Sequence, residues 1–164
     1  MTTIRKLRAE EGMLFKQLRL GALKESPDAF SPTWEDNSAH DDQYWLKSAQ
    51  KIAATENYEI FVAEYDDKPV GLVSGYADGK LTGHIGAMWA DPRIRGKGIG
   101  RQLLLHVVSY LWDRQCQLIE LTVTETNQPA IDLYQSIGFT FTGTDVPLRE
   151  GSTLLNREMT LTRT

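Results

Sequence analysis

Residues Asp91 to Arg101 combine glycines and basic side chains in a spacing that suits the binding of a phosphate group. Glycines stand at every second position, 96, 98 and 100, so the backbone can adopt positive φ and approach a ligand closely. A predicted helix from Gln102 to Arg114 follows, and the unpaired amides and dipole of a first helical turn attract anions. Further positive charge comes from Arg93, Arg95, Lys97 and Arg101. The sequence predicts a phosphate site here, with a solvated basic turn as the alternative.

Two common phosphate-binding motifs do not fit this stretch. The phosphate loop of nucleotide hydrolases ends in Gly-Lys-Ser/Thr, whereas Gly100 is followed here by Arg101 and Gln102. The dinucleotide-binding fingerprint requires a third glycine at the position that Arg101 occupies. The pattern therefore indicates a phosphate site of another kind.

A second stretch, Asn127 to Phe139, is predicted to contain a helix with defined ends. Thr126 or Asn127 can cap its start, and Pro129 suits its first turn. Gly138 suits a left-handed exit from the last turn. These signals fix the local structure before any chemistry is considered.

The two stretches resemble the two signatures of the GNAT superfamily of N-acetyltransferases, and they occur in the family's order. Its acetyl-CoA loop has the pattern Arg/Gln-x-x-Gly-x-Gly/Ala, which Arg95, Gly98 and Gly100 match. Its second pattern, Asn-x-x-Ala-x-x-x-Tyr-x-x-x-Gly-Phe, is matched at every defined position, by Asn127, Ala130, Tyr134, Gly138 and Phe139. The resemblance is firm over residues 83–139 and implies acetyl-CoA as the acyl-donor substrate.

The resemblance also implies roles for individual residues. Tyr134 would protonate the leaving thiolate, and Asn127 would contact the pantetheine or pyrophosphate arm of the coenzyme. A phenol with a pKa of about 10 stays protonated at neutral pH, as this role requires. Tyr134 also completes an apolar helical stripe, so an ordinary core position is the alternative. The loop would hold the pyrophosphate through Arg95, Gly96, Lys97, Gly98, Ile99, Gly100 and Arg101.

Acyl transfer to an amine also requires polarisation of the thioester carbonyl and removal of a proton. Members of the family use a backbone N–H at a bulge in the strand before the loop, which would fall around Met88, Trp89 or Ala90. Many relatives carry a glutamate six residues before the position of Ala90, where this chain has His84. A histidine with a pKa near 6.5 can accept a proton, although a strand histidine can also be structural. The alternative bases are Glu120, Glu125 and water.

The stretch from Glu25 to Leu46 contains six acidic residues and no basic one, interleaved with aromatic side chains. It is interpreted as a wall that attracts a cationic amine. Neutralising Glu35 and Asp36 should then change the KM for the acceptor. The alternative is an acidic, solvated loop that its aromatic residues anchor to the core.

Composition narrows the classes of protein to consider. A chain of 164 residues with 41% hydrophobic content suits one globular domain, 1–164. A net charge of −4 disfavours nucleic acid as a partner. The single cysteine, Cys116, excludes an intrachain disulfide, and the scattered histidines predict no metal site: His40, His84 and His106. No apolar run suits a signal peptide or a membrane span, so a cytoplasmic protein without a membrane partner is expected.

Hydrophobic periodicity predicts alternating strands and helices. Helices are expected over 10–25, from about 42 to 54, over 102–114 and after Asn127. Strands are expected over 3–8, 59–64, 70–76, 83–90, 118–124, 139–144 and 153–161. With the resemblance, these imply a mixed α/β fold: a largely antiparallel central sheet, splayed between strands 83–90 and 118–124, with helices on both sides.

The function expected is acetyl transfer from acetyl-CoA to a primary amine of a small molecule or peptide, by direct attack in a ternary complex. A homodimer is possible, since dimers are common among relatives. One alternative is a non-catalytic acyl-CoA sensor of the same fold. Another is a nucleic-acid-binding module that uses the basic turn, which the net charge and the lack of interleaved aromatic residues disfavour.

Overall fold

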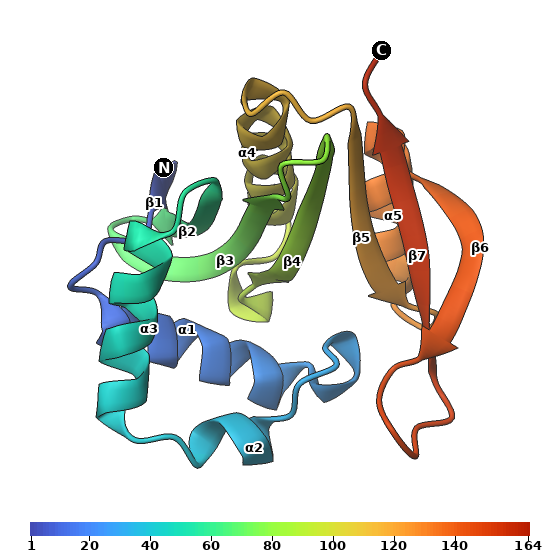
Figure 1. Ribbon diagram of the computed structural model, residues 1–164. Helices are drawn as coiled ribbons and strands as arrows, with labels where there is room; N and C mark the ends of the chain where they lie inside the picture. The colour runs from blue at the N-terminus through green and yellow to red at the C-terminus, as the bar shows by residue number, and fades with distance from the viewer.

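A computed structural model describes residues 1–164 and shows a seven-stranded sheet flanked by helices (Figure 1). The strands lie in the order β1-β2-β3-β4-β5-β7-β6. Neighbouring strands are antiparallel except β4 and β5, which are parallel. This confirms the predicted mixed sheet. The strands are β1 Thr2–Lys6, β2 Tyr58–Tyr65, β3 Lys68–Ala77, β4 Thr82–Ala90, β5 Leu118–Thr124, β6 Thr140–Pro147 and β7 Leu155–Thr162.

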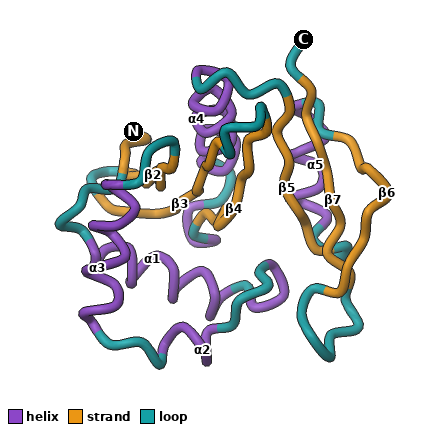
Figure 2. The backbone as a smooth tube through the Cα atoms, in the orientation of Figure 1, coloured by secondary structure: helices purple, strands orange, loops and turns teal.

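Helices cover both faces of the sheet, as predicted (Figure 2). Successive side chains of β2 point to opposite faces, so one strand contributes to two apolar clusters. Ile60 and Val62 pack with α1 and α3, whereas Phe61 belongs to the larger cluster with α4 and α5. The helices are α1 Gly12–Glu25, α2 Trp34–Ser38, α3 Asp42–Ala54, α4 Ile99–Asp113 and α5 Gln128–Ile137, with short 3-10 turns η1 Pro27–Ala29 and η2 Pro92–Ile94.

Side-chain caps settle where two of the helices begin. The Asp41 carboxylate accepts a hydrogen bond from the Tyr44 amide at 2.9 Å and so caps α3. Asn127, rather than Thr126, caps α5. No helix was predicted over residues 26–41 of the acidic stretch, yet this part forms η1 and α2, the latter capped by Thr33. These short turns escape hydrophobic periodicity because they are only three and five residues long.

Helix α4 packs closely against the centre of the sheet. Its predicted four-residue repeat is buried, with Leu103, Val107 and Leu111 fully shielded from solvent. The approach depends on a glycine beneath it, because a Cβ at Gly75 would lie 2.5 Å from Val107 Cγ2. Helix α4, which follows the glycine-rich loop, is therefore packed tightly against β3.

The sheet opens between β4 and β5, as predicted. These strands pair only over Thr82–His84 and Leu118–Glu120, although both continue beyond that point. Farther along, β4 pairs with β3 and β5 pairs with β7, and the two halves of the sheet diverge (Figure 1). The opening lies at the end of β4 that leads into the glycine-rich loop. None of the helices combines the length and apolar character needed to cross a bilayer.

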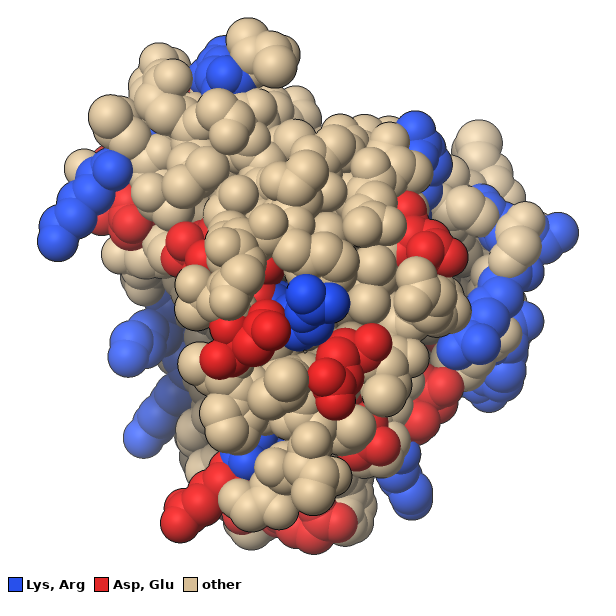
Figure 3. Space-filling model, turned by 90° about the vertical axis from the view of Figure 1, so that its right-hand side faces the viewer, with Lys and Arg blue, Asp and Glu red and all other residues tan.

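Figure 3 shows the side of the molecule that carries β6 and β7. Acidic and basic side chains are mixed on this face, and a basic group near its centre is flanked by acidic ones. The charges form no continuous basic surface on the side in view.

Candidate functional site

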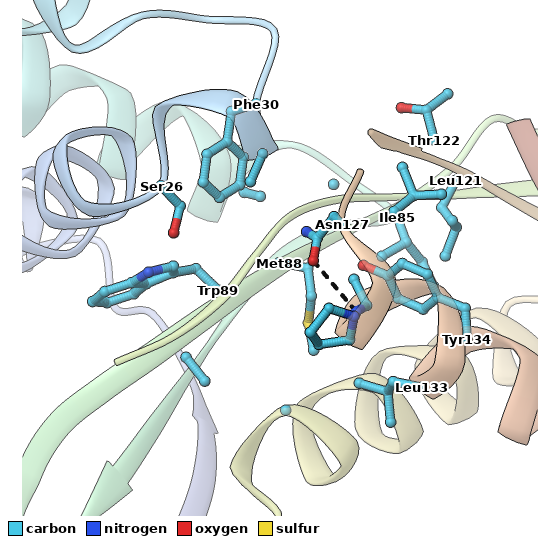
Figure 4. A pocket seen from close by; sticks show the side chains of 18 of the residues that line it. Ser26, Phe30, Ile85, Met88, Trp89, Leu121, Thr122, Asn127, Leu133 and Tyr134 are labelled. Carbon is cyan, nitrogen blue, oxygen red and sulfur yellow. Dashed lines mark hydrogen bonds between the residues drawn. The ribbon is translucent and has the colours of Figure 1, made fainter. Parts of the chain in front are cut away.

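A cavity of about 600 Å³ occupies the opening between the two halves of the sheet (Figure 4). Strand β4 contributes Ile85–Ala90 to its lining, and β5 contributes Leu121–Val123. Residues from the start of α5 and from the segment after α1 close it on either side. Arg95 and Gly100 place the end of the glycine-rich loop at its edge. The cavity thus joins both sequence signatures.

Strand β4 carries a bulge where it borders the cavity. Leu72 and Ser74 of β3 are two residues apart, but their partners Trp89 and Gly86 are three apart, so β4 holds one extra residue. Ala87 has φ of 53°, a left-handed conformation uncommon for a residue with a side chain. The bulge lies at Ala87 and Met88, and it was expected around Met88, Trp89 or Ala90. Such a bulge turns backbone amide groups out of the ladder and toward the cavity.

The glycine-rich loop adopts the backbone conformations that its sequence predicted. Gly96 and Gly98 have φ of 80° and 72°, and Gly98 is the N-cap residue of α4. The first hydrogen bond of α4 runs from the Gln102 amide to the Gly98 carbonyl at 3.0 Å. The amides of Ile99, Gly100 and Arg101 therefore have no acceptor within the helix. The geometry and the dipole of this end of α4 suit the binding of an anion.

The basic side chains of the loop differ in how free they are. Arg93 donates to the Asp91 carboxylate, with Nη2 to Oδ2 at 2.6 Å, and this contact lowers the pKa of Asp91. Lys97 lies over the Tyr65 ring at 5.9 Å. Arg95 is largely exposed and reaches the cavity edge. Arg93 therefore stabilises the turn before the loop, and Arg95 is the cation best placed for a ligand.

Helix α5 presents its N-terminal end to the cavity through Asn127. The Asn127 Oδ1 accepts a hydrogen bond from the Ala130 amide at 3.4 Å, which leaves the side-chain NH₂ group for a ligand (Figure 4). Gly138 ends the helix with φ of 118°, as predicted. Both capping residues thus hold α5 in the orientation that places Tyr134 at the cavity.

Tyr134 combines a core ring with a hydroxyl group at the cavity. The side chain is 5% exposed, and its ring packs edge-on against Phe139 with centroids 6.0 Å apart. Burial raises the pKa of Tyr134 to about 12. Figure 4 shows its oxygen directed into the cavity, near Asn127. The core and the chemical interpretations of this residue are therefore compatible, because they concern different ends of one side chain.

His84 does not line the cavity, so the structure does not support the base role predicted for it. Its Nδ1 lies 2.9 Å from Glu120 Oε1, and its Nε2 lies 3.1 Å from Asp78 Oδ2. The ring also stacks on Tyr76. His84 sits where β4 and β5 are still paired, before the opening. The alternatives Glu120 and Glu125 are also absent from the lining.

Two charged side chains of α1 line the cavity: Glu25, which belongs to the acidic stretch interpreted as an acceptor wall, and Arg19, which the sequence interpretation did not single out. Glu25 is the only carboxylate in the lining, whereas Glu35 and Asp36 lie in α2 outside it. Glu25 accepts hydrogen bonds from Trp89 Nε1 at 3.0 Å and from the Ser26 hydroxyl, and it lies 3.7 Å from Arg95 Nη2. Arg19 also lines the cavity. The helical phase of α1 could have indicated which of its charged residues face inward, but not that a cavity lies there.

Comparison with known proteins identifies sequence relatives. The chain is 32% identical over 143 residues to a mycothiol acetyltransferase of Acidothermus cellulolyticus, covering 83% of this chain and 43% of that protein. A streptothricin acetyltransferase of Streptomyces lavendulae is 43% identical over 61 residues, which cover 37% of this chain and 32% of that protein. The chain thus spans less than half the length of these relatives.

Solved structures share the fold at lower identity. An acetyltransferase of the GNAT family from Streptococcus pneumoniae superposes with a TM-score of 0.80 at 20% identity, covering 99% of this chain and 100% of that one. A structure of YncA from Salmonella typhimurium with its cofactor acetyl-CoA superposes with a TM-score of 0.79 at 21% identity, covering 99% and 94%. A model of the acetyltransferase (GNAT) family matches residues 21–139, which include both signatures and all of the cavity lining except Arg19 and Asn156. The chain therefore belongs to the GNAT acetyltransferase family.

Proposed function

We propose that this protein transfers an acetyl group from acetyl-CoA to a primary amine of a small molecule or peptide, by direct attack in a ternary complex. The observation that carries the proposal is the position of the cavity. It lies between an anion-binding helix end, where the loop enters α4, and the Tyr134 hydroxyl of α5. A thioester held from the loop would reach into the space beside that hydroxyl.

The donor side of the proposal rests on backbone groups. The amides of Ile99, Gly100 and Arg101 would donate to the pyrophosphate, and the Arg95 guanidinium would add a full positive charge. The Asn127 side-chain NH₂ would donate to the pantetheine arm. A Cβ built at Gly100 would lie 3.6 Å from side-chain carbons of both Leu133 and Met88, an ordinary contact distance, so these side chains lie close to the start of α4.

The bulge in β4 would supply the group that polarises the thioester carbonyl. An amide N–H around Met88 would donate to the oxygen as negative charge develops on it during attack. A fixed donor of this kind stabilises the transition state by about 3 kcal/mol. Because Met88, Trp89 and Ala90 all line the cavity, the acceptor amine would approach along this strand.

Tyr134 would serve as the proton donor to sulfur. Its pKa of about 12 keeps the phenol protonated at all physiological pH values, but it also makes the phenol a weak acid. Burial of the leaving thiolate in the same cavity would also raise the pKa of the coenzyme thiol, and this narrows the difference in pKa between the phenol and the thiol. Tyr134 would therefore donate a hydrogen bond to the sulfur as the C–S bond breaks and negative charge develops, and would then transfer its proton to the thiolate.

No side chain is assigned as the base in this proposal. The acceptor would bind as the neutral amine after losing a proton to water, so the rate should rise with pH until the amine is deprotonated. Glu25 accepts hydrogen bonds from Trp89 and Ser26, which fix its carboxylate at the cavity, and it would orient the amine.

The test is a screen of primary amines with acetyl-CoA, in which release of the free thiol is followed with time. Turnover that depends on the amine supports the proposal. Tight coenzyme binding without turnover on any amine would overturn it and favour an acyl-CoA sensor of the same fold.

A further inference from the structure

Arg19 presents an unpaired positive charge in the wall of the cavity. Its Nη1 atom is fully shielded from solvent and has no hydrogen-bond partner. The guanidinium lies over the Phe30 ring at 5.2 Å from the centroid, and Phe30 also lines the cavity. No carboxylate lies within ion-pair distance of it. Burial without a partner lowers the pKa of Arg19.

A buried guanidinium without an acceptor is costly, so such groups usually have a partner. The carboxylate of Glu25, which shares the cavity, is held instead by Trp89, Ser26 and Arg95. Another cation of α1, Lys16, has its own partner in Asp42 at 2.8 Å. Arg19 is therefore left with donors that only a ligand in the cavity can satisfy.

The coenzyme is poorly placed to be that ligand. Its phosphates would bind at the start of α4, which packs on one face of the sheet. Arg19 belongs to α1, which packs on the opposite face. The group that meets Arg19 therefore comes from the acceptor side of the cavity.

We propose that the acceptor amine carries a carboxylate, which Arg19 binds. This inference rests on the proposed acetyl transfer and specifies its substrate class: an amine of the amino-acid type. Arg19 would hold the carboxylate through charged hydrogen bonds, and the apolar wall formed by Phe30 and Trp89 would hold the rest of the molecule. Arg19 acts here in substrate recognition, not in the chemical step.

The test compares amines that differ only in the carboxylate. The standard amino acids are assayed as free acids and as their carboxamides, with acetyl-CoA and thiol detection. A charged hydrogen-bond pair in a cavity should favour the acid in kcat/KM by about 10- to 100-fold. Arg19→Gln should remove this preference, and Arg19→Lys should restore part of it. Lys16→Gln, which removes a cation from the same helix but outside the cavity, should leave the preference unchanged.

The outcomes separate the inference from the function on which it rests. Turnover of acids and carboxamides at equal rates, or of carboxylate-free polyamines alone, would overturn the inference while the acetyltransferase assignment stands. Activity only on amines that bear a phosphate would overturn the carboxylate assignment. No turnover on any amine would overturn the proposed function itself. Protection of wild-type protein against thermal unfolding by N-acetylated amino acids, and its loss in Arg19→Gln, gives a readout independent of turnover.

Discussion

Replacing Tyr134 by phenylalanine isolates the role of one oxygen atom. The side chain is 95% shielded and its ring packs against Phe139, and the burial and the ring contact both remain in the variant. The hydroxyl forms no hydrogen bond within the protein, and it is absent from the fully shielded unpaired atoms, which are Arg19 Nη1 and Trp45 Nε1. It therefore has access to the cavity. We expect the free energy of unfolding to change by less than about 1 kcal/mol.

The effect of Tyr134→Phe on catalysis should be much larger than its effect on stability. Loss of a general acid typically lowers the rate about 10²- to 10⁴-fold, and 10²-fold corresponds to about 2.7 kcal/mol. The loss should appear in kcat, with the dissociation constant for acetyl-CoA unchanged, because the hydroxyl acts on sulfur only as the thiolate forms. Thiol release and equilibrium coenzyme binding measure the two quantities separately.

The pH profile gives a second reading of the same residue. The phenol acts while protonated, and burial raises its pKa to about 12, so its contribution persists as pH rises and is lost only near pH 12. A tyrosine at its ordinary pKa of about 10 would lose half its contribution at pH 10. Tyr110→Phe is the matched control, since Tyr110 is also a buried tyrosine but lies outside the cavity. An unchanged kcat in Tyr134→Phe, or an equal loss in Tyr110→Phe, would refute the reasoning.

Four further substitutions test the loop, the core and the base predicted from the sequence, with Gly21→Ala as the control for the core. Gly98→Ala introduces a side chain at φ of 72° without a clash, so the backbone should carry strain of about 1 kcal/mol. In a calorimetric titration, this strain should weaken acetyl-CoA binding several-fold. Unchanged affinity would argue against this turn as the phosphate site. Gly75→Ala places a Cβ 2.5 Å from Val107 and should lower the free energy of unfolding, measured in urea, by about 1–3 kcal/mol. Gly21→Ala places a Cβ at an ordinary contact distance within α1 and should raise the free energy of unfolding by about 0.5–1 kcal/mol. A change of the same sign in both variants would contradict the packing described. His84→Ala should leave kcat/KM within about three-fold of the wild-type value, because His84 lies outside the cavity. A loss of about 10²-fold or more would instead indicate that His84 acts as the base.

The sequence predicted best where backbone conformation and short-range spacing determine the structure. Gly96 and Gly98 have the positive φ that their spacing suggested, and Gly138 ends α5 as expected. The parallel β4–β5 pair follows from the strand-helix-strand connection. Each of these features depends on residues close in the chain, so a single sequence contains the necessary signal.

The features that escaped prediction depend on contacts between distant segments. His84 satisfied a spacing rule, but its position in the paired part of β4 directs it to Asp78 and Glu120. Arg19 was not singled out, because a basic residue in an amphipathic helix is ordinarily solvated. Its surroundings depend on tertiary packing, which places the guanidinium over the Phe30 ring in the wall of the cavity.

One irregularity in β4 accounts for both the cavity and its chemistry. The strand pairs with β5 over three residues, and beyond them the bulge at Ala87 and Met88 shifts its register against β3. Bulges bend a strand and increase its twist, so this bulge adds to the divergence of β4 from β5, which begins after their last pair, His84 and Glu120. The same residues turn backbone groups toward the space that the bend opens. A substitution that removed the bulge would therefore be expected to narrow the cavity and to misplace the amide that we propose binds the thioester carbonyl. This segment should then tolerate less change than its partial exposure suggests.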